Sequence, residues 1–163
     1  MSGASGLDLL PIIRCKYGSL EAPKFFFVQD ALSKRPYDPL VQQLREDFAV
    51  EEDTDPNDDV SFGYLLSRNT QQWRLELSML GPFAVLLRIT EPGHVDLVSH
   101  DLTARTEQEE SILAILQRND IKIMERNELV QPVAIKLQNT SPQNSRLYQA
   151  LFGDTDILPW HSD

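Results

Sequence analysis

The alternation of apolar and polar side chains within residues 60–99 constrains the fold of this chain more than any other feature. Trp73 and Leu75, for example, alternate with the charged residues Arg74 and Glu76. A period of two residues is typical of a β-strand that turns one face toward a core and the other toward water. We therefore expect the rest of the chain to cover the apolar face of this stretch.

Turn-forming residues divide this stretch into strands. They lie at 68–70, 81–82 and 91–93, and the last two groups contain both proline and glycine. The sequence thus predicts an antiparallel meander, with strands at about 60–67, 72–79, 83–90 and 95–99. The third strand begins with five apolar residues at 83–87. It should therefore lie at the centre of the sheet, with both faces covered.

Residues 38–49 have the pattern of an amphipathic helix. Asp38 is a suitable N-cap and Pro39 a suitable first helical residue. The apolar residues that follow share one face at helical spacing, among them Leu40 and Leu44. We expect this helix to pack its apolar stripe on the sheet.

Residues 106–118 carry the clearest helix signal. Thr106 and Glu109 have the spacing of a capping box, in which each side chain bonds the backbone N–H of the other residue. Asn119 is a suitable left-handed stop. The apolar segment at 121–124 is predicted to be a strand that returns to the sheet.

Short apolar runs lie near both ends of the chain. Those at 9–13 and 25–28 are predicted to be extended segments or loops that cover the core, and the run at 147–152 to be a last strand or helix. Trp160 should be packed, and residues 1–8 should be frayed. Taken together, the sequence predicts a single α+β domain, with an antiparallel meander sheet of about four to six strands and two main helices packed against it.

Composition is typical of a cytoplasmic globular protein. The N-terminus lacks the basic segment of a secretory signal, and no apolar run is long enough to cross a bilayer. The single cysteine, Cys15, allows no internal disulfide, and we expect a half-buried, inert thiol. The net charge of −10 repels nucleic acid but attracts a basic protein, although it also serves simple solubility.

The densest acidic segment lies between the first predicted helix and the meander. Its candidate partner-binding residues are Glu51, Glu52, Asp53, Asp55, Asp58 and Asp59. They form either a solvated loop or a docking surface for a basic partner. The segment also begins like a calcium loop, but Asp58 and Tyr64 stand where that loop needs glycine and glutamate. We therefore expect no metal site and no cofactor.

The fourth predicted strand offers a second candidate site. His94, Asp96 and His100 would share one strand face, and two histidines with a carboxylate suit zinc or a general base. On a continuous strand, however, the two histidines would lie about 20 Å apart, because each residue adds about 3.3 Å. We interpret these residues as the polar face of an edge strand, with a metal-dependent hydrolase as an alternative.

Three segments of the chain together share the layout of a known class of proteins. They are residues 73–84, which read WRLELSMLGPFA, the helix and strand at 106–124, and the closing segment 151–160. In these segments the chain resembles small bacterial immunity proteins, the antidotes encoded beside polymorphic or contact-dependent toxins. The resemblance implies a non-enzymatic α+β inhibitor that binds one toxin tightly. It assigns no binding residues, because such interfaces vary from pair to pair.

We therefore predict a non-enzymatic, cytoplasmic protein-binding module, most concretely an immunity-type inhibitor that neutralises a basic toxin through its acidic surface. One alternative is an adaptor or structural subunit that docks through 25–28 or through the C-terminal tail. The hydrolase with His94, Asp96 and His100 is the other. Neither nucleic acid nor a membrane is an expected partner, and the sequence leaves the oligomeric state open.

Overall fold

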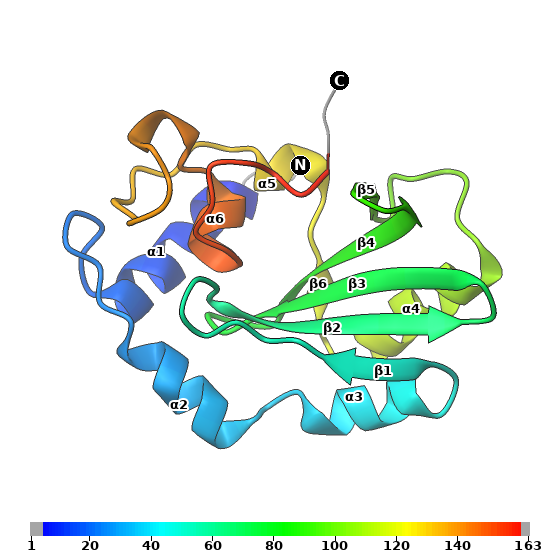
Figure 1. Ribbon diagram of the computed structural model, residues 1–163. Helices are drawn as coiled ribbons and strands as arrows, with labels where there is room; N and C mark the ends of the chain where they lie inside the picture. Colours follow the sequence, from blue (N-terminus) through cyan, green and yellow to red (C-terminus); the bar gives the residue numbers. More distant parts are fainter. Residues whose placement is uncertain (1–4, 161–163) are drawn as a thin grey trace.

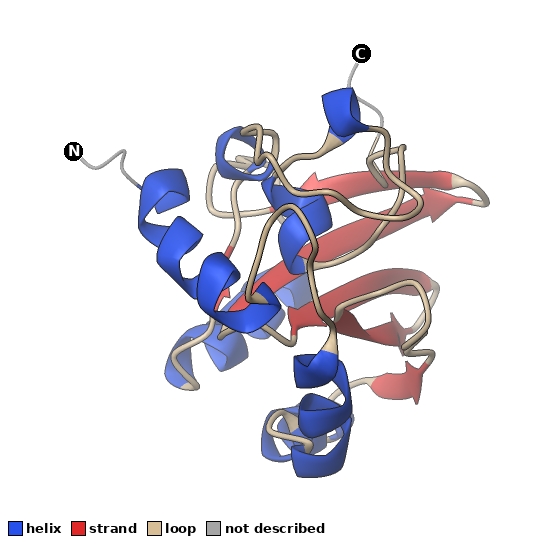
Figure 2. Cartoon of the chain, turned by 90° about the vertical axis from the view of Figure 1, so that its left-hand side faces the viewer, coloured by secondary structure: helices blue, strands red, loops and turns tan. Residues whose placement is uncertain are grey.

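The computed structural model describes residues 5–160, which form a mixed arrangement of helices around one sheet (Figures 1 and 2). The helices are α1 (Ser5–Tyr17), α2 (Phe26–Lys34), α3 (Asp38–Arg45), α4 (Glu107–Arg118), α5 (Arg126–Leu129) and α6 (Leu147–Leu151), with a 3-10 turn at Pro142–Asn144. The strands are β1 (Ala49–Glu52), β2 (Ser61–Arg68), β3 (Gln71–Ser78), β4 (Phe83–Glu91), β5 (His94–Val98) and β6 (Lys122–Ile123).

Five strands follow one another across the sheet in chain order, from β1 to β5, and each is antiparallel to the next. β6 pairs with β4 in parallel, so that Lys122 lies beside Phe83 and Ile123 beside Ala84. The predicted α+β class and the meander are confirmed, and every predicted strand boundary lies within one residue of the observed one. β1 was not predicted, because its residues were assigned to the helix end and the acidic segment.

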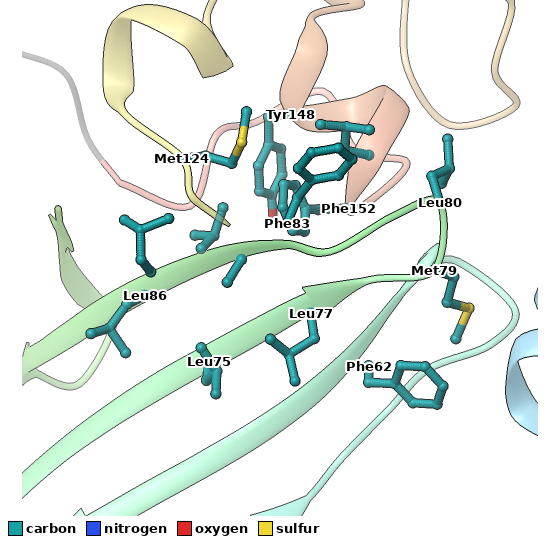
Figure 3. Close-up of a cluster of buried hydrophobic side chains, with 14 of the residues drawn as sticks. Phe62, Leu75, Leu77, Met79, Leu80, Phe83, Leu86, Met124, Tyr148 and Phe152 are labelled. Atoms are coloured by element: carbon teal, nitrogen blue, oxygen red, sulfur yellow. The ribbon is translucent and has the colours of Figure 1, made fainter. Parts of the chain in front are cut away.

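The polar face of β3 is covered in the second half of the strand, which corrects the prediction that this face meets water, although Gln72 at the start of the strand is exposed. On one face Trp73 packs edge-on against Phe48, which follows α3. On the other face Glu76 and Ser78 are buried, because hydrogen bonds tie them to α6. Figure 3 shows the two layers, with Leu75 and Leu77 on one side of the sheet and Tyr148 and Phe152 on the other.

The central position of β4 is confirmed. Its first five residues, 83–87, are all buried. This part of β4 pairs with β3 on one side. On the other side it pairs first with β6, at Phe83 and Ala84, and then with β5, from Leu86 onward. A strand enclosed in this way needs apolar side chains on both faces, which is what the sequence supplies.

The apolar runs near the N-terminus are helical rather than extended, so this prediction was wrong. Leu9, Ile13 and Tyr17 are buried and lie four residues apart, which places them on one stripe of α1 despite the proline at position 11. In α2, Phe27 and Val28 are buried. In both helices the buried face extends beyond the apolar segment seen in the sequence, at 9–13 or 25–28, so these segments alone did not indicate a helix. Of the segment predicted to be frayed, residues 1–4 lie outside the described residues, and α1 begins at Ser5.

The two predicted main helices are present: α4 has the predicted bounds, and α3 is shorter than predicted. α3 stops at Arg45, because the chain turns there to enter β1. α4 has the predicted capping box, in which Thr106 accepts a hydrogen bond from the Glu109 backbone. Asn119 does not adopt the left-handed conformation, since its side chain caps the helix by donating to the carbonyl of Ile115. Asp120 takes the positive φ instead.

The apolar run at 147–152, predicted to be a strand or a helix, forms the short helix α6, whose residues are all buried. Trp160 is packed as expected, at 1% exposure. Within residues 5–160, no helix has the length and apolarity needed to cross a membrane.

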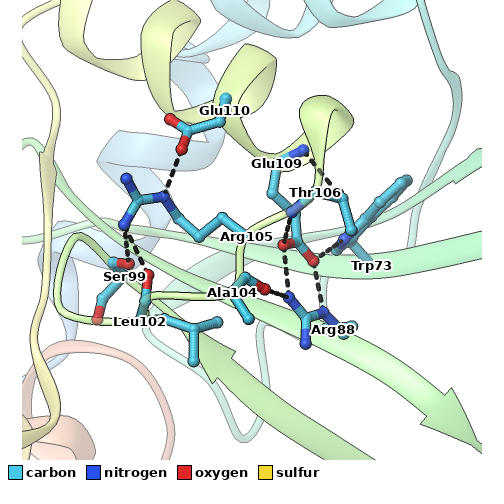
Figure 4. A network of polar contacts seen from close by, with 9 residues as sticks. All are labelled: Trp73, Arg88, Ser99, Leu102, Ala104, Arg105, Thr106, Glu109 and Glu110. Carbon is cyan, nitrogen blue, oxygen red and sulfur yellow. Dashed lines mark hydrogen bonds and ion pairs between the residues drawn. The ribbon is translucent and has the colours of Figure 1, made fainter.

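A buried charge joins α4 to the sheet (Figure 4). Glu109 is fully buried and accepts two hydrogen bonds of 2.6 Å from Arg88 of β4 and one of 2.9 Å from the indole of Trp73. Burial would raise the pKa of Glu109, but the hydrogen bonds from Arg88, Trp73 and Thr106 outweigh it and hold the pKa below its usual value. The carboxylate thus fixes the angle at which α4 meets β3 and β4.

This network yields a stability prediction. Glu109→Gln should lower the free energy of unfolding by about 2–3 kcal/mol, because it leaves the guanidinium of Arg88 without its counter-charge. Glu110→Gln, on the exposed side of the same helix, should change it by less than about 0.5 kcal/mol. Urea unfolding followed by circular dichroism measures both values. Equal effects of the two substitutions would contradict the structural role of Glu109.

Candidate functional site

The end of α6 is fixed to the meander by buried hydrogen bonds to its last carbonyl groups. The hydroxyl of Ser78 donates to the carbonyl of Leu151 (2.7 Å), and that of Ser61 donates to the carbonyl of Phe152 (2.9 Å). The backbone N–H of Val60 also donates to Phe152 (2.9 Å). A helix end leaves its final carbonyls without helical partners, and here the strands β2 and β3 supply them.

This attachment places the loop before β2 beside the segment after α6, as the blue-green loop and the red segment in Figure 1 show. Asp59 and Gly153 form an isolated antiparallel bridge, and the N–H of Asp154 donates to the carbonyl of Asp58. A Cβ at position 153 would lie 3.0 Å from a carboxylate oxygen of Asp59. The close approach of the two segments therefore favours glycine there.

Carboxylates from the two segments line an open hollow of about 580 Å³, which we call the acidic hollow. Its acidic residues are Asp55, Asp58, Asp59, Asp154 and Asp156, and its other lining residues are Asn139, Thr155 and Ile157. The side chain of Ile157 is 70% exposed at its border. The hollow therefore combines concentrated negative charge with an accessible apolar group.

A second, narrower space of about 220 Å³ continues from this hollow, and we call it the apolar cavity. Its name refers to the apolar part of its lining, which is formed by Phe25, Val28, Pro56, Val60 and Leu137; the rest of the lining is polar and includes Asn57, Gln138 and Gln149. It also shares Asp58, Asp59 and Asp154 with the acidic hollow. The same carboxylates thus face two adjoining spaces.

Two of the carboxylates also shape the hollow. Asp154 accepts hydrogen bonds from the backbone of Gln138 and Asn139 (3.0 Å each) and from the hydroxyl of Thr140 (2.6 Å). Asp156 accepts one from the backbone N–H of Ser141 (2.6 Å), which holds the pKa of Asp156 below its usual value. These bonds order the segment before α6 around the acidic residues.

Asp59 is the most perturbed carboxyl group of the hollow. Burial, together with the negative charges of Glu76, Asp55 and Asp58, raises its pKa to about 7, and the attraction of Arg74 only partly opposes this. No side chain among the described residues donates a hydrogen bond to its carboxylate. Asp59 is therefore a half-buried acid in a negative field, an arrangement that favours uptake of a positive group.

Arg74 does not neutralise the hollow, because other groups bind it. It donates to Asp53 (2.6 Å) and to Glu76 (3.1 Å), and the hydroxyl of Tyr148 completes the network by donating to Glu76 (2.8 Å). Within residues 5–160, none of the five carboxylates of the acidic hollow forms an ion pair. The charge of this surface is therefore uncompensated.

The six acidic residues singled out from the sequence separate into two groups. Asp55, Asp58 and Asp59 lie together in the acidic hollow. Glu52 is instead bound by Arg35 (2.6 Å), and Asp53 by Arg74. Glu51 is exposed on β1. Sequence reasoning missed Asp154 and Asp156, because only the contact between residues 59 and 153 brings these distant aspartates to the same surface.

The alternative metal site does not assemble in the described part of the chain. His94 opens β5, and His100 lies beyond the end of that strand. Across residues 5–160, no three side chains of histidine, cysteine, aspartate or glutamate are grouped closely enough to hold a metal ion. This statement includes the acidic hollow, whose carboxylates are too widely spread to chelate one cation. Cys15 is exposed rather than half-buried, which corrects that expectation.

Comparisons with protein-family models, with curated proteins and with solved structures find no match. The function proposed below therefore depends on the geometry and charge of the described residues.

The raised pKa of Asp59 makes a testable contribution to the pH dependence of the free energy of unfolding. Because the folded pKa of Asp59 lies above the unfolded value of about 3.8, the folded state binds the proton more tightly. This group therefore lowers the free energy of unfolding as pH rises from about 4 to about 7. After allowance for solvent screening of a half-exposed group, the loss should be about 1–2 kcal/mol.

Asp59→Asn should remove this pH-dependent loss of unfolding free energy. The variant should be more stable than the natural chain at pH 8, and the difference should shrink toward pH 4. Urea unfolding of the two proteins at several pH values measures the difference directly, since all other titrating groups are common to both. A difference independent of pH would show that Asp59 titrates normally.

Proposed function

We propose that this chain is a non-enzymatic protein-binding module that recognises a basic partner through the acidic hollow. The observation that carries this proposal is the group of five aspartates without an ion-pair partner among the described residues, on a chain of net charge −10. Uncompensated negative charge attracts a basic surface over several ångströms and speeds its association. The spread of the carboxylates suits several cationic groups of a protein better than one ion.

Exposed apolar side chains complement this charge. Ile157 borders the hollow at 70% exposure, and Phe25, which lines the apolar cavity, is 37% exposed. Interfaces commonly combine such apolar anchors with a surrounding polar rim. In this proposal the carboxylates steer the partner and pair with it, and the apolar groups hold it in place.

The most concrete form of the proposal is an immunity-type inhibitor acting in the cytoplasm on a basic toxin. Its mechanism would be occlusion: a rigid acidic surface covers basic groups that the toxin needs. The fixed position of the hollow supports this form, because a surface held by buried hydrogen bonds loses little conformational entropy on binding.

An adaptor within a larger assembly is the second candidate. The exposure of Phe26 favours it, because an aromatic ring in water is suited to docking on another subunit. Substituting Phe26 with serine separates the two candidates. Loss of the assembly with unchanged binding of a basic partner would favour the adaptor.

Neutralising the hollow should weaken capture and slow association. Asp55→Asn with Asp156→Asn removes two negative charges and retains oxygens that accept hydrogen bonds. The matched control, Glu91→Gln with Asp101→Asn, removes the same charge from exposed positions outside the hollow and the apolar cavity. The assay is a pull-down from a lysate of the native host, with mass spectrometry of the retained proteins. We expect the natural chain and the control to retain a host protein that the hollow variant does not retain.

The association rate constant of that retained protein is the quantitative readout. At low salt the hollow variant should lower it by about three- to tenfold and flatten its salt dependence, while the control should have a smaller effect. Surface plasmon resonance at two salt concentrations measures both. Equal rate constants for the hollow variant and the natural chain would overturn the proposal.

A further inference from the structure

The apolar cavity beside the acidic hollow has the chemistry of a site for one long cationic side chain. Five of its eleven lining residues are apolar, among them Phe25, Val28 and Leu137, and the other six are polar or acidic. Its volume of about 220 Å³ is several times the share of one water molecule in liquid, about 30 Å³. A polar ligand alone would leave these apolar surfaces without a partner.

The carboxylates lie where this cavity meets the acidic hollow. Asp58, Asp59 and Asp154 line both spaces. The oxygens of Asp154 are already occupied by the backbone at 138 and 139 and by the hydroxyl of Thr140. Asp58 accepts a hydrogen bond from the side-chain amide of Asn139 (3.3 Å). Asp59 receives no side-chain hydrogen bond from the described residues, so of these three carboxylates it is the one most open to a cation.

We infer that the apolar cavity receives a lysine side chain of the basic partner, with its methylenes against Phe25, Val28 and Leu137 and its ammonium group at Asp59. A lysine buries an apolar stem and keeps a compact charge at its tip. The compact ammonium group of lysine needs less space than the planar guanidinium of arginine, which suits a cavity of about 220 Å³. This inference rests on the proposed function and specifies one contact within it.

The surroundings of Asp59 make this contact dependent on pH. Glu76 and Arg74 face it from β3, Tyr148 from α6, and Asp55 and Asp58 from its own loop, while Asp154 lines the same two spaces. With a pKa of about 7, Asp59 is mostly protonated at pH 6 and mostly charged at pH 8. Lysine keeps its charge over this range. Affinity should therefore rise about tenfold from pH 6 to pH 8, in proportion to the charged fraction of Asp59.

Short peptides test the contact without the partner. The probe is acetyl-Gly-Lys-Gly-amide, and its uncharged counterpart carries norleucine in place of lysine. Each is titrated into the full ¹⁵N-labelled chain and followed by amide chemical shifts. We expect the lysine peptide to shift the amides of Val28, Asp59 and Leu137 with a millimolar dissociation constant, and the norleucine peptide to bind at least tenfold more weakly.

Substitution of the acid completes the test. Asp59→Asn should weaken binding of the lysine peptide about tenfold and remove its dependence on pH, while Glu91→Gln should change neither. Equal binding of the two peptides, or no localised shift at tens of millimolar lysine peptide, would overturn the inference. The proposed function would survive that result if neutralising Asp55 and Asp156, which do not line the apolar cavity, still slows association of the retained protein.

Discussion

The attachment of the α6 carboxyl end to the meander is the interaction on which the rest of the described structure depends. Serine hydroxyls of β2 and β3 bind the carbonyls of Phe152 and Leu151, and the hydroxyl of Tyr17 in α1 binds that of Ala150 (2.7 Å). Three elements from distant parts of the sequence therefore satisfy one helix end. These bonds cover the polar face of the sheet, and they bring the segment after α6 against the loop that precedes β2.

Charge is distributed unequally around this framework. Arg35, Arg74, Arg88 and Arg105 each pair with carboxylates outside the acidic hollow. Glu109 illustrates the consequence, because its buried charge is fully matched and holds α4 in place. The carboxylates of the hollow form no ion pair among the described residues. The fold thus pairs several acids outside the hollow with arginines and leaves the acids of the hollow without ion pairs in the described part of the chain. This distribution suits the hollow to binding a basic partner.

The sequence was informative where local pattern decides the structure. Alternation predicted β2 to β5 within one residue, and the capping box of Thr106 and Glu109 predicted the start of α4. It was uninformative where a long-range contact decides. The burial of Glu76 depends on α6, and the acidic hollow depends on the bridge between Asp59 and Gly153. Three of the five aspartates of the hollow were therefore visible as part of an acidic segment, while Asp154 and Asp156 were not. The helical form of α1 was missed because its stripe, from Leu9 to Tyr17, extends beyond the short apolar run that drew attention.

Zero-length carbodiimide cross-linking of the chain to the retained host protein would test the central claim most directly. This reagent joins a carboxylate to a lysine only when the two are in contact, so mass spectrometry of the products maps the interface. The account predicts that cross-links concentrate on Asp55, Asp58, Asp59 and Asp156. Cross-links that fall instead on exposed acids such as Glu91 and Asp101 would contradict it, since these residues lie outside the acidic hollow and the apolar cavity.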